Sequence, residues 1–305
     1  MPQSQRDVRN RIGAVKNIQK ITRAMEMVAA ARLRRAEQRI EALRPYADAI
    51  RRMTRQAAEA AGNVPRLPIL QEHDQMERVG LLLVAGDRGL AGAFNSNIVR
   101  AGVAAGRQHD AEGRTPVYFA SGRRPATSLT FRGLEPAENF TGFTDRPAYA
   151  DARRIAERLM AAYIDDEIDK LEIFYNGYIS PVTQVLRRET LLPLQQATVL
   201  EESDKDEEEG RDDRGSGHRP EVEYEPDPED ILRRLVPDYV EISVFRALLE
   251  STASEHGARM TAMRNASDNA GELIQTLTLE MNRARQAEIT QEILEVVAGA
   301  EGLSG

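Results

Sequence analysis

The chain has 305 residues, of which 41% are hydrophobic and 5% aromatic, and it carries a formal net charge of −8. It contains no cysteine, which excludes disulfides, thiolate metal sites and cysteine nucleophiles, and its four histidines are too widely spaced for a metal-binding pair. No apolar run approaches the ~20 residues that span a bilayer, and the N-terminus has no signal-peptide core. We therefore expect a soluble, intracellular protein without a metal or cofactor.

The charge is divided unevenly along the chain. Residues 1–55 contain 14 Lys and Arg against 5 Asp and Glu, a net charge of +9. Residues 201–230 contain 4 Lys and Arg against 15 Asp and Glu, a net charge of −11. Such segregation suggests that the two regions have different partners.

The N-terminal region has the periodicity of one long helix. Apolar residues recur at steps of three or four, slip near residues 29–32, and resume as far as Met53. The first part of this stripe consists of Val8, Ile12, Val15, Ile18, Ile21, Met25 and Val28. The pattern predicts a helix of about fifty residues, roughly 75–80 Å long, with a possible kink at Pro45.

The middle of the chain has a different pattern. The continuous apolar run at 79–85 predicts a strand that is buried on both faces. Further strands are expected at 117–120, 170–175, 182–186 and 190–199, and helices at 95–108, 122–131 and 148–164. Alternating strands and helices of this size predict an α/β domain with a mostly parallel sheet.

The last third begins with a low-complexity acidic segment, residues 201–220, which we expect to be disordered because it has no apolar anchors. A short helix is then expected to reach Val236 and to be interrupted by Pro237. From Asp238 to Gly299 the periodicity predicts a second long helix, about 90 Å in length.

Two helices of this length cannot bury their apolar stripes in an α/β domain of modest size. Because that domain lies between them in the sequence, pairing them predicts an antiparallel coiled coil around a central Rossmann-like α/β domain. The predicted organisation is a coiled-coil helix at 1–58, a linker at 59–76, the α/β domain at 77–200, an acidic insertion at 201–220 and a coiled-coil helix at 221–305. The alternative is a larger helical domain that contains both helices.

The residues alone leave other functions open. The turn at 86–92 follows a strand, but its G-x-x-G-x-x-G spacing differs from the dinucleotide-binding G-x-G-x-x-G, which favours a structural turn. The basic N-terminal helix lacks the interleaved aromatic residues of a nucleic-acid interface. His256 is interpreted as a packed histidine of the helical seam. A small-molecule α/β protein and a nucleic-acid-binding protein, each with a coiled-coil arm, remain the alternatives.

Specific strings add a resemblance to a known family. Residues 6–36 and 283–300 (RARQAEITQEILEVVAGA) closely resemble the terminal helices of the gamma subunit of F-type, rotary ATP synthases. Asp87-Arg88-Gly89-Leu90, followed by Phe94-Asn95, resembles a turn of that family, as does the segment 224–228. Gly302 stands where the family usually has Ser, Ala, Lys or Arg, and Ala91 replaces a frequent Cys.

The resemblance implies a non-catalytic rotor shaft of a proton-translocating ATP synthase, on the cytoplasmic face of a bacterial cell membrane. Its implied partners are the alpha and beta subunits, the epsilon subunit and the c-ring. Matching positions imply contact with the beta subunit at Met25, Arg259, Gln286 and Thr290, and with the c-ring at Tyr224 and Glu225.

Overall fold

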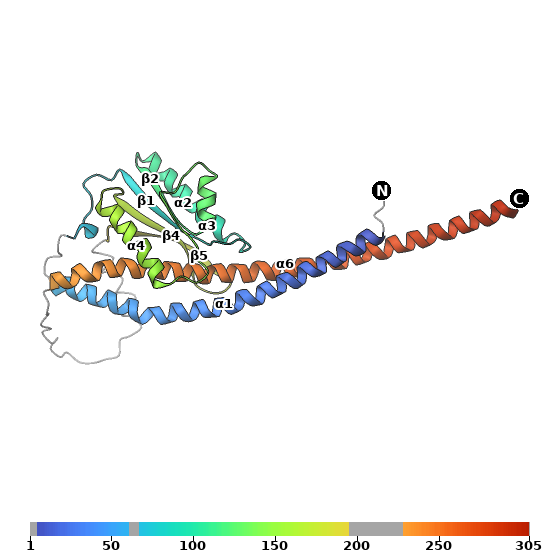
Figure 1. The fold of residues 1–305 in the computed structure, drawn as a ribbon, viewed down its shortest axis with the longest axis horizontal. Helices are drawn as coiled ribbons and strands as arrows, with labels where there is room; N and C mark the ends of the chain where they lie inside the picture. Colours follow the sequence, from blue (N-terminus) through green and yellow to red (C-terminus); the bar gives the residue numbers. More distant parts are fainter. Residues whose placement is uncertain (1–4, 61–66, 195–227, 305) are drawn as a thin grey trace. The chain divides into compact units, whose positions relative to one another are not determined.

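A computed structural model describes residues 5–60, 67–194 and 228–304 (Figure 1). Two long helices, α1 (Gln5–Ala60) and α6 (Pro228–Ser304), enclose an α/β region in the sequence. This region consists of η1 (Pro68–Leu70), β1 (Arg78–Val84), α2 (Phe94–Ala111), β2 (Thr115–Ser121), α3 (Arg123–Thr130), β3 (Glu138–Phe140), α4 (Tyr149–Ile164), β4 (Lys170–Tyr178) and β5 (Gln184–Leu192). The predicted architecture of two long terminal helices around an α/β domain is confirmed.

The chain divides into two compact units. Unit 1 contains α1 up to Ala31 and α6 from Arg259 onward, and unit 2 contains everything from Arg32 to Ala258. Both long helices contribute to both units. The predicted domain boundaries follow another criterion, the composition of the sequence, and they remain predictions.

The sheet has the strand order β3-β2-β1-β4-β5. Its first four strands are parallel, and β5 pairs antiparallel with β4. The prediction of separate strands at 182–186 and 190–199 was wrong, because the single strand β5 runs through both as far as Leu192; residues 195–199 lie outside the described part. The short strand β3 was not predicted.

Two apolar layers cover the sheet. Alternate residues of β1 point to opposite faces, so Leu81 and Leu83 pack with α2 and α3 while Leu82 and Val84 pack with α4 and α6. Figure 1 shows α2 and α3 on one side of the strands and α4 on the other. The second layer also contains Ala47 and Ile50 of α1. The run at 79–84 is therefore buried on both faces, as predicted.

The predicted break at Pro237 does not occur. Helix α6 continues through this proline, although proline cannot donate the backbone hydrogen bond of its turn. Leu235, Val236 and Val240, on either side, are buried in the core of unit 2. Their burial offsets the lost hydrogen bond, because each buried aliphatic side chain contributes about 1.5–3 kcal/mol.

Unit 1 is an antiparallel pair of helices. Val8 and Ile12 of α1 pack with Leu277 of α6. Farther along α1, the Gln19 side chain donates to the Ser267 carbonyl at 3.2 Å, and Glu26 accepts from Arg264 at 2.9 Å. Later residues of α1 thus meet earlier residues of α6, which confirms the antiparallel pairing.

The buried seam of α1 differs from the predicted stripe. Ile18, Ile21 and Val28 are exposed by 54%, 59% and 53%, whereas the neighbouring Thr22 and Ala29 are buried. The seam residues are Val8, Ile12, Val15, Gln19, Thr22, Glu26, Ala29, Leu33 and Ala36, all buried or half-buried, at alternating steps of four and three. This is the heptad spacing of a coiled coil, and polar groups occupy its middle.

Candidate functional site

In parallel α/β sheets of this kind, ligands bind at the carboxyl edge where the strand order reverses. Here β2 and β4 lie on opposite sides of β1, so the reversal falls between β1 and β4. A dinucleotide-binding loop would have to line this crevice.

Helix α6 occupies the crevice. The Ser251 hydroxyl donates to the carbonyl of Val84, at the end of β1, at 3.3 Å. The Ser254 hydroxyl donates to the carbonyl of Asn176, in β4, at 2.9 Å. These two serine hydroxyls thus satisfy backbone carbonyl groups that would otherwise face a ligand.

The helix lies close to the surrounding backbone. A Cβ atom on Gly86 would lie 2.8 Å from the carboxylate of Glu255, and one on Gly257 would lie 2.9 Å from the carbonyl oxygen of Pro181. All eleven residues from Ala247 to Gly257 are buried. Small residues of α6 at the contact, Ser251, Ser254 and Gly257, allow this close approach, which fixes the α/β domain to the helix.

Asp87 holds the turn after β1. Its Oδ1 accepts from the backbone N–H of Arg123 at 2.9 Å, and its Oδ2 accepts from the N–H of Gly142 at 2.9 Å and the hydroxyl of Thr144 at 3.0 Å. The carboxylate therefore joins three segments of the domain. Its hydrogen bonds agree with the predicted structural turn at 86–92.

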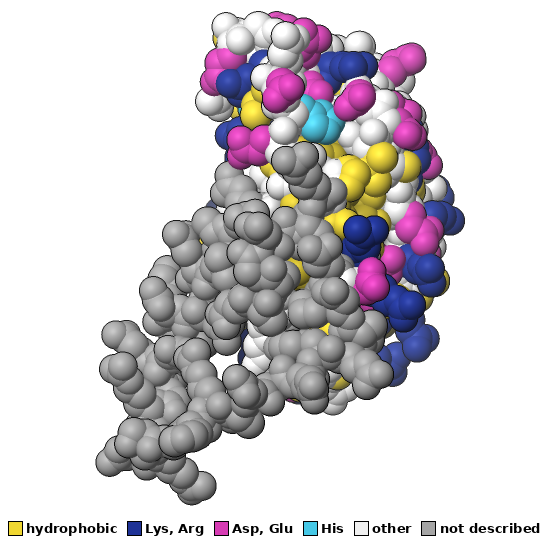
Figure 2. Space-filling view, turned by 90° about the vertical axis from the view of Figure 1, so that its left-hand side faces the viewer, with side chains coloured by type: hydrophobic (Ala, Val, Ile, Leu, Met, Phe, Trp, Pro, Cys, Tyr) yellow, Lys and Arg dark blue, Asp and Glu magenta, His cyan; other side chains and the backbone are white. Residues whose placement is uncertain are grey.

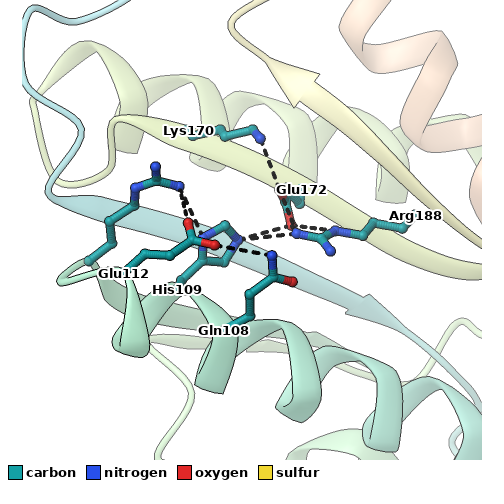
Figure 3. A network of polar contacts seen from close by, with 7 residues as sticks. Gln108, His109, Glu112, Lys170, Glu172 and Arg188 are labelled. Carbon is teal, nitrogen blue, oxygen red and sulfur yellow. Dashed lines mark hydrogen bonds and ion pairs between the residues drawn. The ribbon is translucent and has the colours of Figure 1, made fainter.

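A second polar cluster lies between α2, β4 and β5 (Figure 3). The buried Glu172 carboxylate lies 3.4 Å from Nε2 of the buried His109, 2.8 Å from the Arg188 guanidinium and 3.0 Å from the Lys170 ammonium. Burial by itself raises the pKa of Glu172, but Lys170, Arg188 and His109 together hold it below its usual value. The cluster has no nucleophile, and we interpret it as an internal ion-pair network.

This network predicts a pH dependence of stability. A carboxyl whose folded-state pKa is lowered stabilises the fold above its unfolded pKa, and this stabilisation is lost as the pH falls through the folded value. Glu172→Gln should cost about 1–3 kcal/mol at pH 7 and should flatten the loss of stability below about pH 4. The measurement is urea unfolding as a function of pH. The control is Glu157→Gln, which removes an ion pair between side chains that are about half exposed; an equal effect of both variants would contradict the prediction.

The described residues offer no evident metal site. His73 lies 3.0 Å from Asp169 and 3.6 Å from Asp166, but Asp169 also accepts the backbone N–H groups of Glu77 and Arg78. No group of three or more His, Asp or Glu suited to a metal ion occurs in residues 5–60, 67–194 and 228–304. On the face drawn in Figure 2, acidic and basic side chains are mixed.

The predicted contact residues in unit 1 fall into different environments. Met25 is half-buried and Arg259 is buried, while Gln286 and Thr290 are exposed. The Thr290 hydroxyl donates to the Gln286 carbonyl at 2.8 Å, so these two residues lie one turn apart on the same face of α6. Arg259 precedes them by about 40 Å of helix. Tyr224 and Glu225 lie outside the described residues.

The last part of α6 has an apolar surface that packs against nothing in the described chain. Every residue from Arg285 to Ala298 is exposed. Ile293, Leu294 and Val296 are among them, with 58%, 63% and 72% of their surface accessible. An apolar helix surface of this extent is typical of a site that another protein covers.

Sequence patterns did not reveal all of these features. The polar residues of α6 at the crevice and the Glu172 network were not predicted. One sequence pattern could have indicated the filled crevice: the run of small residues Ser251-Thr252-Ala253-Ser254 inside a long helix. No sequence pattern indicated the Glu172 network, because His109, Glu172 and Arg188 are far apart in the sequence.

None of the described helices is both long enough and apolar enough to cross a bilayer. The fold defines a class of protein: an α/β domain inserted between two long helices, with its ligand crevice filled by one of them. Comparisons with known proteins give the family within this class.

A family model described as ATP synthase matches residues 4–303. The chain is 43% identical over 301 residues to the ATP synthase gamma chain of Rubrobacter xylanophilus, covering 99% of both sequences. It is 41% identical over 298 residues to that of Moorella thermoacetica, covering 98% of each. The chain belongs to the ATP synthase gamma chain family.

Solved structures show the same fold. A chain of the Euglena gracilis mitochondrial ATP synthase, in a structure of OSCP, F1 and the c-ring, matches with a TM-score of 0.65 at 19% identity, over 98% of this chain and 94% of that one. A chain of the Tetrahymena thermophila mitochondrial central stalk and c-ring matches with a TM-score of 0.58 at 23% identity, over 81% of this chain and 99% of that one.

Proposed function

We propose that this chain is the central shaft of a proton-translocating F-type ATP synthase and carries the rotation of the c-ring to the catalytic alpha and beta subunits. Membership of the gamma chain family over the full length supports this role. The structural observation that carries it concerns helix α6. This helix fills the crevice of the α/β domain and is fixed there by hydrogen bonds, and it continues without a break to an exposed apolar end. A force on the domain would therefore act directly on the helix.

The proposed role needs no catalytic site in this chain. The crevice where an α/β protein of this topology would bind a nucleotide is filled by its own helix. A single asymmetric shaft cannot present the same surface to three surrounding sites at once. Each site is biased towards a different conformation by the contacts that it makes, and rotation exchanges those biases.

The contacts proposed for this shaft come from the family resemblance. The beta subunit would contact Met25, Arg259, Gln286 and Thr290, and the c-ring would contact Tyr224 and Glu225. The alpha subunit would complete the ring around the helices, and the epsilon subunit would bind near the α/β domain. The complex would lie on the cytoplasmic face of a bacterial cell membrane, with this chain as a peripheral, non-catalytic subunit.

Reconstitution tests the proposal. Alpha and beta subunits of the same enzyme should form an active ATPase with this chain, and sustained ATP hydrolysis should depend on its addition. The chain alone should hydrolyse no ATP. Failure of the purified chain to assemble with alpha and beta, or an equal ATPase activity in its absence, would overturn the proposed function.

A further inference from the structure

Unit 2 contains a cavity of about 580 Å³ with an unusual charge distribution. Its lining includes Arg32, Arg35 and Arg39 of α1, Asp145 and Arg146 of the loop before α4, and His256 of α6. Four guanidinium groups thus share one cavity with a single carboxylate. The volume lies within the roughly 300–1,000 Å³ of ordinary ligand pockets.

The one carboxylate does not balance these charges. Asp145 forms an ion pair with Arg32, and its other oxygen lies 4.0 Å from Nε2 of His256. Arg39 donates to the backbone carbonyl of Pro147. In the described part of the chain, no carboxylate forms an ion pair with Arg35, Arg39 or Arg146, which leaves an excess of three positive charges.

Two of these arginines repel each other. Burial lowers the pKa of Arg39, and the nearby positive charge of Arg146 lowers it further. Like charges that share a partly desolvated cavity are destabilising. A bound anion would offset this repulsion and would accept hydrogen bonds from the guanidinium groups that line the cavity.

We infer that this cavity is a binding site for the phosphate chain of a di- or triphosphate compound. Guanidinium groups present planar pairs of N–H donors that match phosphate oxygens, and such charge-assisted hydrogen bonds are about twice as strong as neutral ones. Several arginines in one cavity favour a chain of linked phosphates over a single one, because each phosphate can meet a different guanidinium. This inference goes beyond the proposed function and does not rest on it.

The test is calorimetric titration of the full chain, at low ionic strength and without divalent cations, with inorganic tripolyphosphate as the probe. Saturable binding of one tripolyphosphate per chain is expected. The double variant Arg35→Gln/Arg39→Gln should weaken it by roughly tenfold or more. Replacing Arg39 also removes its hydrogen bond to Pro147, so Arg146→Gln provides a second variant, and it should weaken binding several-fold.

The matched control is the double variant Arg34→Gln/Arg100→Gln. It removes the same charge, but Arg34 lies on an exposed face of α1 outside the cavity and Arg100 on an exposed face of α2. The affinity of this control variant for tripolyphosphate should stay within about twofold of that of the unmodified chain. Equal weakening by the cavity and control variants would reveal general charge attraction and overturn the inference, as would the absence of saturable binding.

Two further titrations identify the source of the phosphate. ATP should bind about as tightly as tripolyphosphate, and adenosine should not bind, if the phosphate chain alone is recognised. Binding of ATP without binding of tripolyphosphate would contradict a phosphate site. Because only the isolated chain is used, a negative result here leaves the reconstitution test of the shaft unaffected.

Discussion

Replacing Gly122 by alanine is expected to destabilise the α/β domain by about 3–5 kcal/mol. Gly122 connects β2 to α3 with φ of +110°, a conformation that residues with a Cβ rarely adopt. A Cβ atom there would lie 2.3 Å from the carbonyl oxygen of Ala85 and 3.0 Å from that of Gly86. Both neighbours are backbone atoms, so neither can move away as a side chain would. The measurement is urea unfolding followed by circular dichroism.

Gly113→Ala provides the matched control. Gly113 also has a positive φ, +80°, but no atom lies within 4 Å of the position of its Cβ. Its replacement should cost only the backbone preference, about 1–2 kcal/mol. If both alanine variants lowered the free energy of unfolding equally, close packing of the turn at Gly122 against the end of β1 would not be the cause.

Replacing Arg259 and Gln286 together by alanine is expected to lower ATP hydrolysis by the assembled complex roughly tenfold or more. Losing one partner of a buried charged contact typically costs about 2–5 kcal/mol, and about 1.4 kcal/mol already corresponds to a factor of ten in rate. On the proposed function, these side chains contact the beta subunit, so the loss should appear in turnover and not in helix content. The measurements are steady-state ATPase activity and circular dichroism of the isolated chain.

The control for this pair is Arg283→Ala/Gln275→Ala. These residues have the same side chains, lie on α6 and are exposed. Normal activity is expected. Unchanged hydrolysis by the Arg259/Gln286 variant, in a complex shown to be fully assembled, would remove both residues from the proposed contact.

The extent to which the fold follows from the sequence depends on the element. The buried strand β1 could be predicted because its uninterrupted apolar run suits only a strand covered on both faces. Strand β5 is an edge strand with mostly exposed or half-buried residues, so its apolar signal is broken and its ends were misplaced.

The seam of unit 1 shows a different limit. Hydrophobicity selected Ile18, Ile21 and Val28, which are exposed, instead of Gln19, Thr22 and Glu26, which line the seam. Periodicity identifies apolar stripes but does not say which surface covers each of them. A helix that packs against a helix of its own chain on one face and against another protein on a second face has two apolar stripes. Only the three-dimensional structure shows which stripe is buried within the chain.

The candidate sites were predictable only in part. Gln286 and Thr290 are ordinary exposed polar residues by every local criterion, and the family resemblance alone singles them out. The arginine cavity and the filled crevice depend on contacts between residues more than a hundred positions apart, such as Arg32 with Asp145 and Ser251 with Val84. No short-range pattern encodes such contacts.

The central claim is that this chain turns as a shaft. Because the sequence has no cysteine, Phe131→Cys at the end of α3, where the side chain is 90% exposed, would give one site for attaching a visible probe. In a complex held to a surface by its alpha and beta subunits, the probe should rotate in one direction while ATP is hydrolysed. A probe that stays still in complexes that hydrolyse ATP would contradict the claim.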